Sequence, residues 1–417
     1  MQAQGIKSIK SLGIQDTLDF EVNHEDHNFY AEGIIVSNSH AMGYGALTSI
    51  TGYLKANHTK EFFLSLLKAA KNEQNTLEEI SVIEKEMNQL GIKLLPPNIF
   101  KSELNFSIQP EGILMGLGNI KGIAEKAVAK LDKFRHPFAN KFDIFQSAEE
   151  AKIPINILSV LIGVGAMDGL YKQSRSWCIL EASLWTKLTT KEKIWAQKLG
   201  EENDWDLLKI VPKLKELKDD KGKVIIKESR FETIKKAYAP YKEIYRQNSA
   251  YQDFTDWVMS VTYLGFSHGK TLKDIFIEKR PGLINLAELK EKFNEDRVAF
   301  VGQIIDVMKG TSKKGNKYIK FLVADETSQF GAWIFKDAIE QCEELNGGQL
   351  PKEGDFVIVR GTKKGKDSVF AEVVAVQKNN VLLKTSQVKE TEEDTDFAPV
   401  SNIIFARKLD EEEENIN

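Results

Sequence analysis

The spacing of apolar residues changes twice along this chain, and those changes limit the folds open to it. Short β-branched or alternating runs occupy residues 6–36, apolar residues recur at helical spacing between residues 46 and 90, and a period of two returns at Arg297. A period of two is typical of half-buried strands, and a period near 3.6 of amphipathic helices. The sequence therefore predicts a multidomain α+β protein that begins with a small β unit and continues as helices.

Five strand-like segments near the C-terminus predict a small barrel. They lie near residues 298–307, 317–324, 330–335, 355–361 and 368–376, and lysine- and glycine-rich turns join them. Short strands of this number and spacing are typical of a five-stranded barrel of the OB type. We assign this barrel to residues 297–377, and the helix-rich stretch before it, residues 176–296, to a helical connecting region.

Composition narrows the classes of function. The net charge of −4 argues against a strongly basic nucleic-acid binder, but residues 386–417 hold ten acidic and three basic side chains, so the remaining body is net positive. Residues 378–417 are predicted to be a solvated acidic tail. Cys178 and Cys342 lack the spacing of a zinc site or a disulfide framework. With neither a long apolar run nor a signal sequence, a cytoplasmic protein is expected.

Asn38 and Ser39 could carry out chemistry on their own backbone. An asparagine amide can attack its own carbonyl carbon, close a succinimide and release the next residue. A positioned histidine such as His27 typically adds ~10²- to 10⁴-fold in rate. The Ser39 hydroxyl could take an acyl group from another chain before that release. The alternative is that Asn38 and Ser39 are ordinary turn residues and His27 a surface imidazole.

The sequence around this junction resembles the last two sequence blocks of an intein. The matching segments run from Thr17 to Val22, from His27 to Ala31 and from Gly33 to Ser39. The resemblance implies that Asp19 and His27 assist, that Asn38 cyclises and that Ser39 is the first residue retained. Inteins usually have histidine where this chain has Ser37. Residues 1–38 are thus expected to be the C-terminal half of a split intein, whose N-terminal half lies on a partner chain.

Residues 39 to about 175 are similar to the alpha subunit of bacterial DNA polymerase III. The matching segments, in order, are Ser39-His40-Ala41, Tyr53 to Ala56, Gly91 to Pro97, Gly116 to Gly122 and Leu161 to Asp168. A weaker match covers Leu264 to His268, followed by Gly269 where the family has proline. The resemblance implies an all-helical fingers portion over residues 39–95 and a helix-hairpin-helix region over 96–175. It also places His40 and Lys55 near an incoming nucleotide.

The stretch from Ile120 to Val128 has the form of a helix-hairpin-helix turn. In such a turn, glycines let backbone N–H groups at a helix N-terminus meet a phosphate. Ala124 stands where many hairpins have a second glycine. The candidate DNA-binding residues here are Gly116, Gly118, Lys121 and Gly122, and the alternative is that these glycines only punctuate loops between helices.

The barrel segment combines basic turns with aromatic residues. Its candidate DNA-binding residues are Lys313, Lys314, Lys317, Tyr318 and Trp333, and a second basic turn holds Arg360, Lys363, Lys364 and Lys366. Basic groups that follow phosphates, together with rings that stack on bases, are how such barrels hold single strands. Strand alternation places Tyr318 and Lys320 on one face, opposite Phe321 in the core. The face on which Trp333 and Phe335 lie stays open, and the alternative is an aromatic core beside a solvated basic loop.

These patterns together predict a precursor fragment of a replicative DNA polymerase III alpha subunit. Trans-splicing would join it to an N-terminal fragment that carries the intein N-half and the palm, and only the joined product would polymerise. We assign no metal or cofactor to this fragment, since the family's Mg²⁺-binding carboxylates lie in the palm.

Other expected partners are template–primer and single-stranded DNA, without a membrane, in a bacterial or phage-infected cell. The segment from Gln252 to Trp257 could be a sliding-clamp peptide, and the alternative is an ordinary helix surface. The rival function is a non-enzymatic single-stranded nucleic-acid binder with a decayed intein remnant.

Overall fold

The computed structural model divides into two compact units, one ending at Phe63 and the other starting at Leu64. It describes residues 28–31, 34–37, 41–73, 75–250, 252–277, 280–312 and 315–376. Several predicted features lie outside these residues, namely Asp19, His27, Asn38, Ser39, His40, Lys313, Lys314 and the acidic tail. The predicted boundaries of the domains stay predictions.

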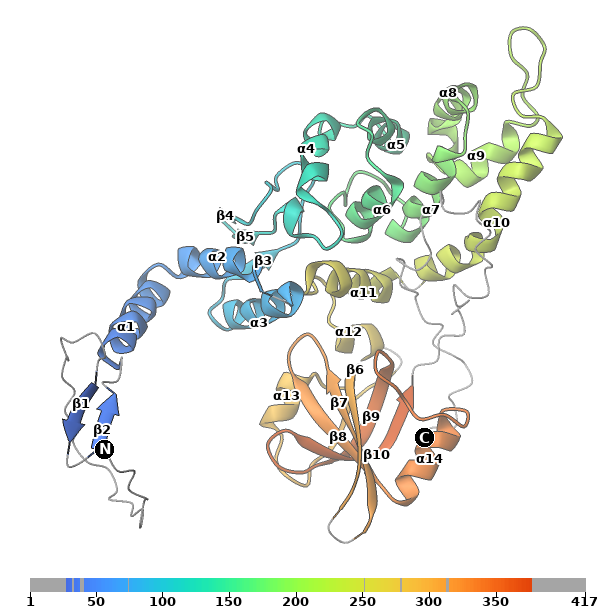
Figure 1. The fold of residues 1–417 in the computed structure, drawn as a ribbon. Coiled ribbons are helices and arrows are strands. Elements are labelled where there is room, and N and C mark those ends of the chain that lie inside the picture. The colour runs from blue at the N-terminus through green and yellow to red at the C-terminus, as the bar shows by residue number, and fades with distance from the viewer. Residues whose placement is uncertain are drawn as a thin grey trace. The chain divides into compact units, whose positions relative to one another are not determined.

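The first unit contains a β-hairpin and a helix (Figure 1). Strands β1 (Asn28–Ala31) and β2 (Ile34–Ser37) pair antiparallel, with Asn28 opposite Ser37. These strands confirm the β-branched or alternating runs at 29–31 and 34–36, while Gly33 and the run from Thr17 to Val22 lie outside the described residues. Helix α1 (Ala41–Asn57) follows, and α2 (Thr59–Ala70) begins in this unit.

The second unit begins with helices and a small sheet. Helix α3 (Thr76–Gln89) confirms, with α1 and α2, the helices expected between residues 46 and 90. Strands β3 (Lys93–Leu95), β4 (Ser107–Gln109) and β5 (Gly112–Leu114) form a sheet with the order β3-β5-β4. The prediction of an all-helical fingers portion over residues 39–95 is therefore wrong at β3, and strands β4 and β5 were not predicted. Strands of three residues are too short to show an alternating pattern.

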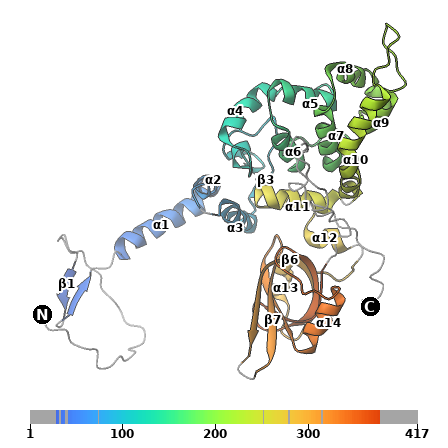
Figure 2. The ribbon, with the colours of Figure 1, turned by 45° about the vertical axis from the view of Figure 1, so that its right-hand side comes forward.

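A series of helices runs from residue 117 to residue 291 of the second unit (Figures 1 and 2). The first group is η1 (Leu117–Asn119), α4 (Glu125–Phe134), α5 (Lys141–Glu150), α6 (Ile155–Gly163) and α7 (Arg175–Thr186). The second group is α8 (Thr190–Leu199), η2 (Glu201–Asn203), α9 (Leu207–Lys213), α10 (Glu228–Ala250), α11 (Gln252–Leu264), α12 (Leu272–Ile277) and α13 (Leu286–Glu291).

Several of these helices begin at residues whose side chains cap them. Asn140 accepts a hydrogen bond from the Asp143 N–H at the start of α5, and Ser174 accepts one from the Trp177 N–H at the start of α7. Thr189 forms a reciprocal capping box with Glu192 at the start of α8. A cap satisfies one of the N–H groups that a helix N-terminus leaves without a partner, so these side chains fix where the helices start.

A buried ion pair joins three helices of this unit. Lys141 at the start of α5 donates to the carboxylate of Glu181 on α7, and both side chains are at most 1% exposed. The other Glu181 oxygen accepts a 2.7 Å hydrogen bond from the Leu207 N–H at the start of α9. Burial raises the pKa of Glu181 to about 7, although Lys141 beside it opposes that shift. The pair therefore holds the starts of α5 and α9 against α7.

The five predicted C-terminal strands form a closed barrel. They are β6 (Arg297–Thr311), β7 (Lys317–Ala324), β8 (Gln329–Phe335), β9 (Phe356–Lys363) and β10 (Ser368–Val376), in the order β10-β8-β7-β6-β9. Strands β8 and β10 pair parallel and the other neighbours antiparallel. Helix α14 (Asp337–Leu345) connects β8 to β9. Five strands with this closure form an OB-like barrel, which confirms the predicted architecture.

Helices α11 and α12 cover the face of the barrel formed by β6 and β9. Phe254 and Trp257 of α11 pack edge-on against Phe356 of β9, with ring centroids 5.1 and 5.7 Å apart. The Trp257 indole N–H donates a 3.1 Å hydrogen bond to Glu326, whose pKa rises to about 7 through burial and the neighbouring Asp325. Both ribbon views show α11 and α12 between the helices α4 to α10 and the barrel (Figures 1 and 2).

The same contacts bear on the segment from Gln252 to Trp257. Its helix is confirmed, but Phe254 and Trp257 are buried against the barrel instead of lying on a helix surface. A clamp-binding peptide must present its aromatic side chains to a partner, and in this structure those side chains are part of the core.

Candidate nucleic-acid interface

Four aromatic side chains form a cluster on the outer surface of the barrel. The aromatic cluster consists of Tyr318 on β7, Trp333 and Phe335 on β8, and Phe370 on β10. The Tyr318 and Trp333 ring centroids are 5.3 Å apart, and the Trp333 and Phe335 rings lie 6.4 Å apart with only 8° between their planes. Phe370 meets Phe335 edge-on at 5.0 Å and is 43% exposed. Three strands therefore present one continuous aromatic surface.

The pairing of the strands explains why these rings meet. Tyr318 lies opposite Phe335 across the β7–β8 ladder, and Lys320 lies opposite Trp333. On the other side of β8, Phe370 is the register partner of Trp333. Directly opposite residues in a ladder have side chains on the same face, close enough to interact. Trp333 consequently lies between a lysine and an aromatic ring.

Two glycines leave room for the cluster. A side chain at Gly310, which is opposite Tyr318, would stand only 2.5 Å from the tyrosine ring. A side chain at Gly331 would meet the Lys320 stem at 2.9 Å and the Trp333 indole nitrogen at 3.1 Å. Glycine in a strand often marks a place where another group approaches closely. Neither glycine was singled out from the sequence, and their role depends on the strand register.

Two lysine ammonium groups lie over rings of the cluster. The Lys320 Nζ atom is 5.4 Å from the centre of the Trp333 ring, and the Lys364 Nζ atom is 5.9 Å from that of Phe370. An ammonium group at such a distance is attracted by the negative face of the ring. Lys364 also forms an ion pair with Glu295. The surface thus combines positive charge with exposed aromatic faces.

The barrel residues predicted from the sequence are found as follows. Tyr318 and Lys320 point outward while Phe321 is in the core, so the predicted alternation is confirmed. Trp333, whose direction stayed open, is on the same outer surface. Lys317 is exposed at the start of β7. The prediction that Lys363 belongs to a solvated basic turn is wrong. Its side chain is buried, and its ammonium group donates to the backbone carbonyls of residues 290 and 292.

The glycine-rich turn before α4 packs closely against the chain at Leu104 and Asn105. A side chain at Gly116 or Gly118 would clash with the backbone there, and the Gly118 N–H donates a 2.9 Å hydrogen bond to the Leu104 carbonyl. These two glycines therefore have a packing role. Gly122 has a φ of 88°, which suits glycine at a turn. DNA contact at this turn, including contact by the exposed Lys121, stays a prediction.

Lys55 and the possible metal ligands lie on other elements of the chain than the aromatic cluster and the glycine-rich turn. Lys55 lies on α1, where its Nζ atom is 5.8 Å from the Phe63 ring centre. The segment Asp204-Trp205-Asp206 has an Asp-x-Asp spacing that would suit metal ligation. In the structure, however, the Asp206 carboxylate caps α9 by accepting hydrogen bonds from the N–H groups of residues 208 and 209. Within the described ranges, no group of three or more His, Cys, Asp or Glu side chains is arranged to hold a metal ion.

Comparison with known proteins supplies the family context. A model of the helix-hairpin-helix motif matches residues 91–177. DNA polymerase III subunit alpha of Campylobacter jejuni is 27% identical over 344 residues, which cover 78% of this chain and 25% of that protein. The chain is homologous to the C-terminal region of DNA polymerase III subunit alpha. The same subunit of Chlamydia pneumoniae is 31% identical over 159 residues, 37% of this chain and 12% of that protein. The chain thus spans from about an eighth to a quarter of these two relatives.

Solved structures similar to about a fifth of this chain include two single-stranded DNA-binding proteins. The mitochondrial protein of S. cerevisiae aligns at 18% identity with a TM-score of 0.18, over 21% of this chain and 99% of that one. The small protein of Streptomyces coelicolor aligns at 17% identity with a TM-score of 0.17, over 20% and 95% of the two chains. In the part of the chain that the structure describes, no helix is both long enough and apolar enough to cross a membrane.

Proposed function

We propose that the barrel binds single-stranded DNA, and that the chain serves as the C-terminal part of a replicative DNA polymerase. The observation that carries this proposal is the aromatic cluster with its two lysines, on the barrel of a chain homologous to polymerase III alpha. Bases stack on Tyr318 and Trp333, while Lys317 and Lys320 neutralise the phosphates that follow them. Stacking of this kind accepts every base, so binding is expected to be largely independent of sequence.

A salt titration tests whether the lysines meet phosphates. The slope of log affinity against log salt is expected to be about −0.7 for each phosphate neutralised on a single strand. The Lys317→Ala variant should therefore make that slope less steep by about 0.7, because one phosphate contact is lost. Affinity for an oligothymidylate would be measured by fluorescence anisotropy at several salt concentrations. Lys198→Ala, on α8, is the matched control, and an equal slope in all three proteins would refute the phosphate contacts.

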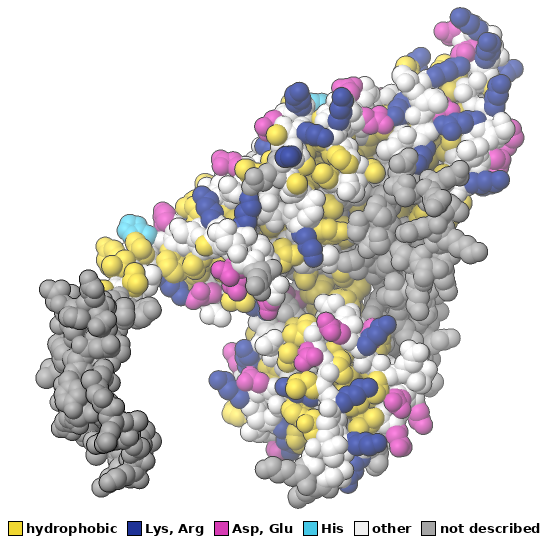
Figure 3. Space-filling model, viewed as in Figure 1, with side chains coloured by type: hydrophobic (Ala, Val, Ile, Leu, Met, Phe, Trp, Pro, Cys, Tyr) yellow, Lys and Arg dark blue, Asp and Glu magenta, His cyan; other side chains and the backbone are white. Residues whose placement is uncertain are grey.

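Polymerisation itself is proposed for the joined product and not for this chain alone. The catalytic Mg²⁺ ions are expected in the palm of the N-terminal partner fragment. Helix α1 supports the proposal that this chain has a surface for the N-terminal partner fragment. Its Leu47, Ile50 and Leu54 side chains recur at helical spacing and are at least 40% exposed. Figure 3 shows hydrophobic side chains gathered over α1. An exposed apolar face on a helix usually marks a surface that another protein covers.

We further propose that residues 1–38 perform trans-splicing. The Ser39 hydroxyl attacks the carbonyl carbon that joins the partner's polymerase fragment to its intein N-half, so that an ester forms on Ser39 and the N-half leaves. The Asn38 side-chain nitrogen then attacks its own carbonyl carbon, which closes a succinimide and breaks the bond to Ser39, with His27 moving the protons and Asp19 assisting. The freed Ser39 amino group displaces the ester oxygen and joins the two fragments by an amide. The support for this step is the resemblance of residues 5–39 to intein sequence blocks.

Mixing the chain with a partner that carries an intein N-half after a polymerase palm tests this step. Intact mass spectrometry should find a ligated product whose downstream part begins at Ser39, and a released peptide of residues 1–38. The Asn38→Ala variant should release no such peptide, because alanine has no nucleophilic nitrogen, whereas Asn57→Ala on α1 should behave as the unmodified chain. Release that persists in Asn38→Ala would show that the asparagine does not cyclise.

A further inference from the structure

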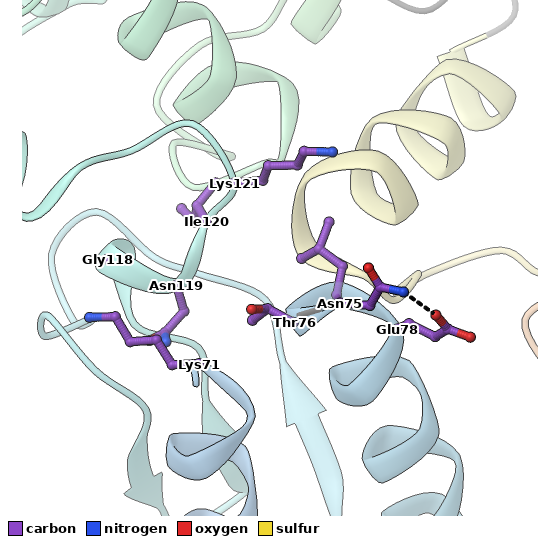
Figure 4. Close-up of a pocket in the computed structure, with 9 residues that line it drawn as sticks. Lys71, Asn75, Thr76, Glu78, Gly118, Asn119, Ile120 and Lys121 are labelled. Atoms are coloured by element: carbon purple, nitrogen blue, oxygen red, sulfur yellow. Dashed lines mark hydrogen bonds between the residues drawn. The ribbon is translucent and has the colours of Figure 1, made fainter. Parts of the chain in front are cut away.

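The lysines of two sites in the described residues are arranged differently. One site is a pocket between the start of α3 and the turn that joins η1 to α4, and Lys71, Asn119 and Lys121 are among the residues that line it. Figure 4 shows the ammonium groups of Lys71 and Lys121 pointing away from one another, so they do not meet at one ligand. The other site is the outer surface of the barrel, where lysines lie over aromatic rings.

Part of the positive charge on the barrel surface has no acidic partner there. Among the described residues of the barrel, the ion pairs include Lys364 and Arg297 but neither Lys317 nor Lys320. Lys317 is exposed at the start of β7, and the Lys320 ammonium group lies over a ring of the aromatic cluster. Positive charge that no neighbouring carboxylate neutralises favours an anionic partner.

The same surface also exposes apolar side chains. Met308 on β6 lies opposite Lys320 on β7, and Lys320 in turn lies opposite Trp333 on β8. Phe370 on β10 is the register partner of Trp333, so one row of side chains crosses four strands. At the two ends of this row, Met308 is 53% and Phe370 is 43% exposed. A partner that fits this surface therefore carries carboxylates and apolar side chains together.

The acidic tail, residues 378–417, has this composition. Its acidic residues form two groups, five of them within residues 390–396 and five more over residues 410–414. Phe397 directly follows the first group, and residues 403–405, two isoleucines and a phenylalanine, lie between the two groups. The tail thus combines negative charge with aromatic and aliphatic side chains, which complements the lysines and rings of the barrel.

The tail is attached to the barrel close enough to reach this surface. Residues rise ~3.3 Å each along a strand, so Val376 at the end of β10 lies about 20 Å from Phe370. An extended chain spans ~3.3 Å per residue, so Glu390 can lie up to about 46 Å from Val376. A partner joined by a short link has an effective concentration on the order of millimolar. Weak contacts between the tail and the barrel are therefore sufficient for docking.

We propose that the acidic tail docks on the aromatic cluster when no DNA strand is bound there. Carboxylates of residues 390–396 pair with Lys317 and Lys320, and the Phe397 ring packs on the exposed rings of the cluster. A DNA strand would neutralise the same lysines and stack on the same rings, so the tail and the strand exclude one another. This competition rests on the proposed function of the barrel, whereas the docking itself does not.

Carbodiimide cross-linking of the full chain without DNA tests the docking. The reagent joins a carboxylate to a lysine amine only where the two groups are in contact. Mass spectrometry of the monomer fraction should find residues 390–396 joined to Lys317 and Lys320, and high salt should remove these links, because salt screens exposed ion pairs. Lys198, an exposed lysine beside Trp195 on α8, is the matched control and should form few such links.

A DNA titration tests the competition. The Glu392→Gln/Glu393→Gln variant should bind an oligothymidylate about two- to tenfold more tightly than the unmodified chain, because the tail loses two exposed ion pairs to the barrel. Glu343→Gln/Glu344→Gln on α14 removes two adjacent exposed carboxylates from the barrel itself and should change the affinity little. Fluorescence anisotropy at one low salt concentration measures all three affinities.

The outcomes separate the docking from DNA binding. Cross-links to Lys317 and Lys320 in a chain that binds no DNA would support the docking and refute the proposed function of the barrel. The docking is overturned if residues 390–396 join neither barrel lysine, or join Lys198 as often. It is also overturned if the chain binds DNA but the tail variant gains no affinity over the unmodified chain.

Discussion

Trp333→Ala is expected to weaken binding of single-stranded DNA by about 5- to 150-fold, because a stacked base contributes about 1–3 kcal/mol. Trp333 belongs to the aromatic cluster, with Lys320 over its ring and with the ring centroids of Tyr318 and Phe335 at 5.3 and 6.4 Å from its own. Alanine removes the stacking surface and the attraction that holds Lys320. Trp333→Phe keeps a ring and should lose less. Fluorescence anisotropy with an oligothymidylate at one fixed salt concentration measures both changes.

The chain offers a closely matched control for this experiment. Trp195 on α8 is also partly exposed, and the Lys198 Nζ atom lies 4.5 Å from its ring centre. Trp195→Ala therefore removes the same kind of ring and the same kind of cation–π contact outside the barrel, and should leave DNA affinity unchanged. If both alanine variants bind DNA as the unmodified chain does, the aromatic cluster is not the interface.

Glu181→Ala is expected to lower the free energy of unfolding of the helical region by about 3–5 kcal/mol. The substitution leaves Lys141 charged and buried, and it takes from the Leu207 N–H its hydrogen-bond acceptor. An unpaired charge in such a site costs far more than the pair itself contributes. Urea denaturation at pH 8, where the carboxylate is ionised, should show an earlier transition. Hydrogen exchange at Leu207 should also become faster.

Two further variants separate the buried charge from a general effect of substitution. Lys141→Met/Glu181→Leu replaces the whole pair with apolar side chains and should recover much of the lost stability, because no charge is left buried. Asp253→Ala breaks the ion pair with Lys270, in which both side chains are about half exposed, and should change the transition little. A Glu181→Ala chain that unfolds at the same urea concentration as the unmodified chain would contradict the prediction.

Local pattern was sufficient to predict the barrel strands and the helices between residues 46 and 90. Alternation along β7 separates Tyr318 from Phe321, because successive side chains of a strand point to opposite faces. The same rule could not orient Trp333, since its strand offered no clear polar face. The cluster also depends on the parallel pairing of β8 with β10, which brings Phe370 beside Phe335. Pairings between distant segments leave no periodic trace in the sequence.

Burial of charged and polar groups was the other feature that the sequence did not reveal. Lys363 looks like a solvated turn residue beside Lys364, yet its ammonium group satisfies two backbone carbonyls under the barrel edge. The pocket beside Asn119 likewise brings together residues 71–78 and 118–121, which are about forty positions apart in the chain. Composition and spacing describe neighbours along the chain, and these sites are built from neighbours in space.

Helix α11 has a mechanical consequence for the whole helical region. Its Trp257 and Phe254 side chains pack against the barrel. Near its other end, the Tyr263 carbonyl accepts a hydrogen bond from the Lys121 N–H. A rigid rod fixed at both places cannot shift at one without pulling on the other. A force on the barrel would therefore be transmitted through α11 to the hydrogen bond between the Tyr263 carbonyl and the Lys121 N–H.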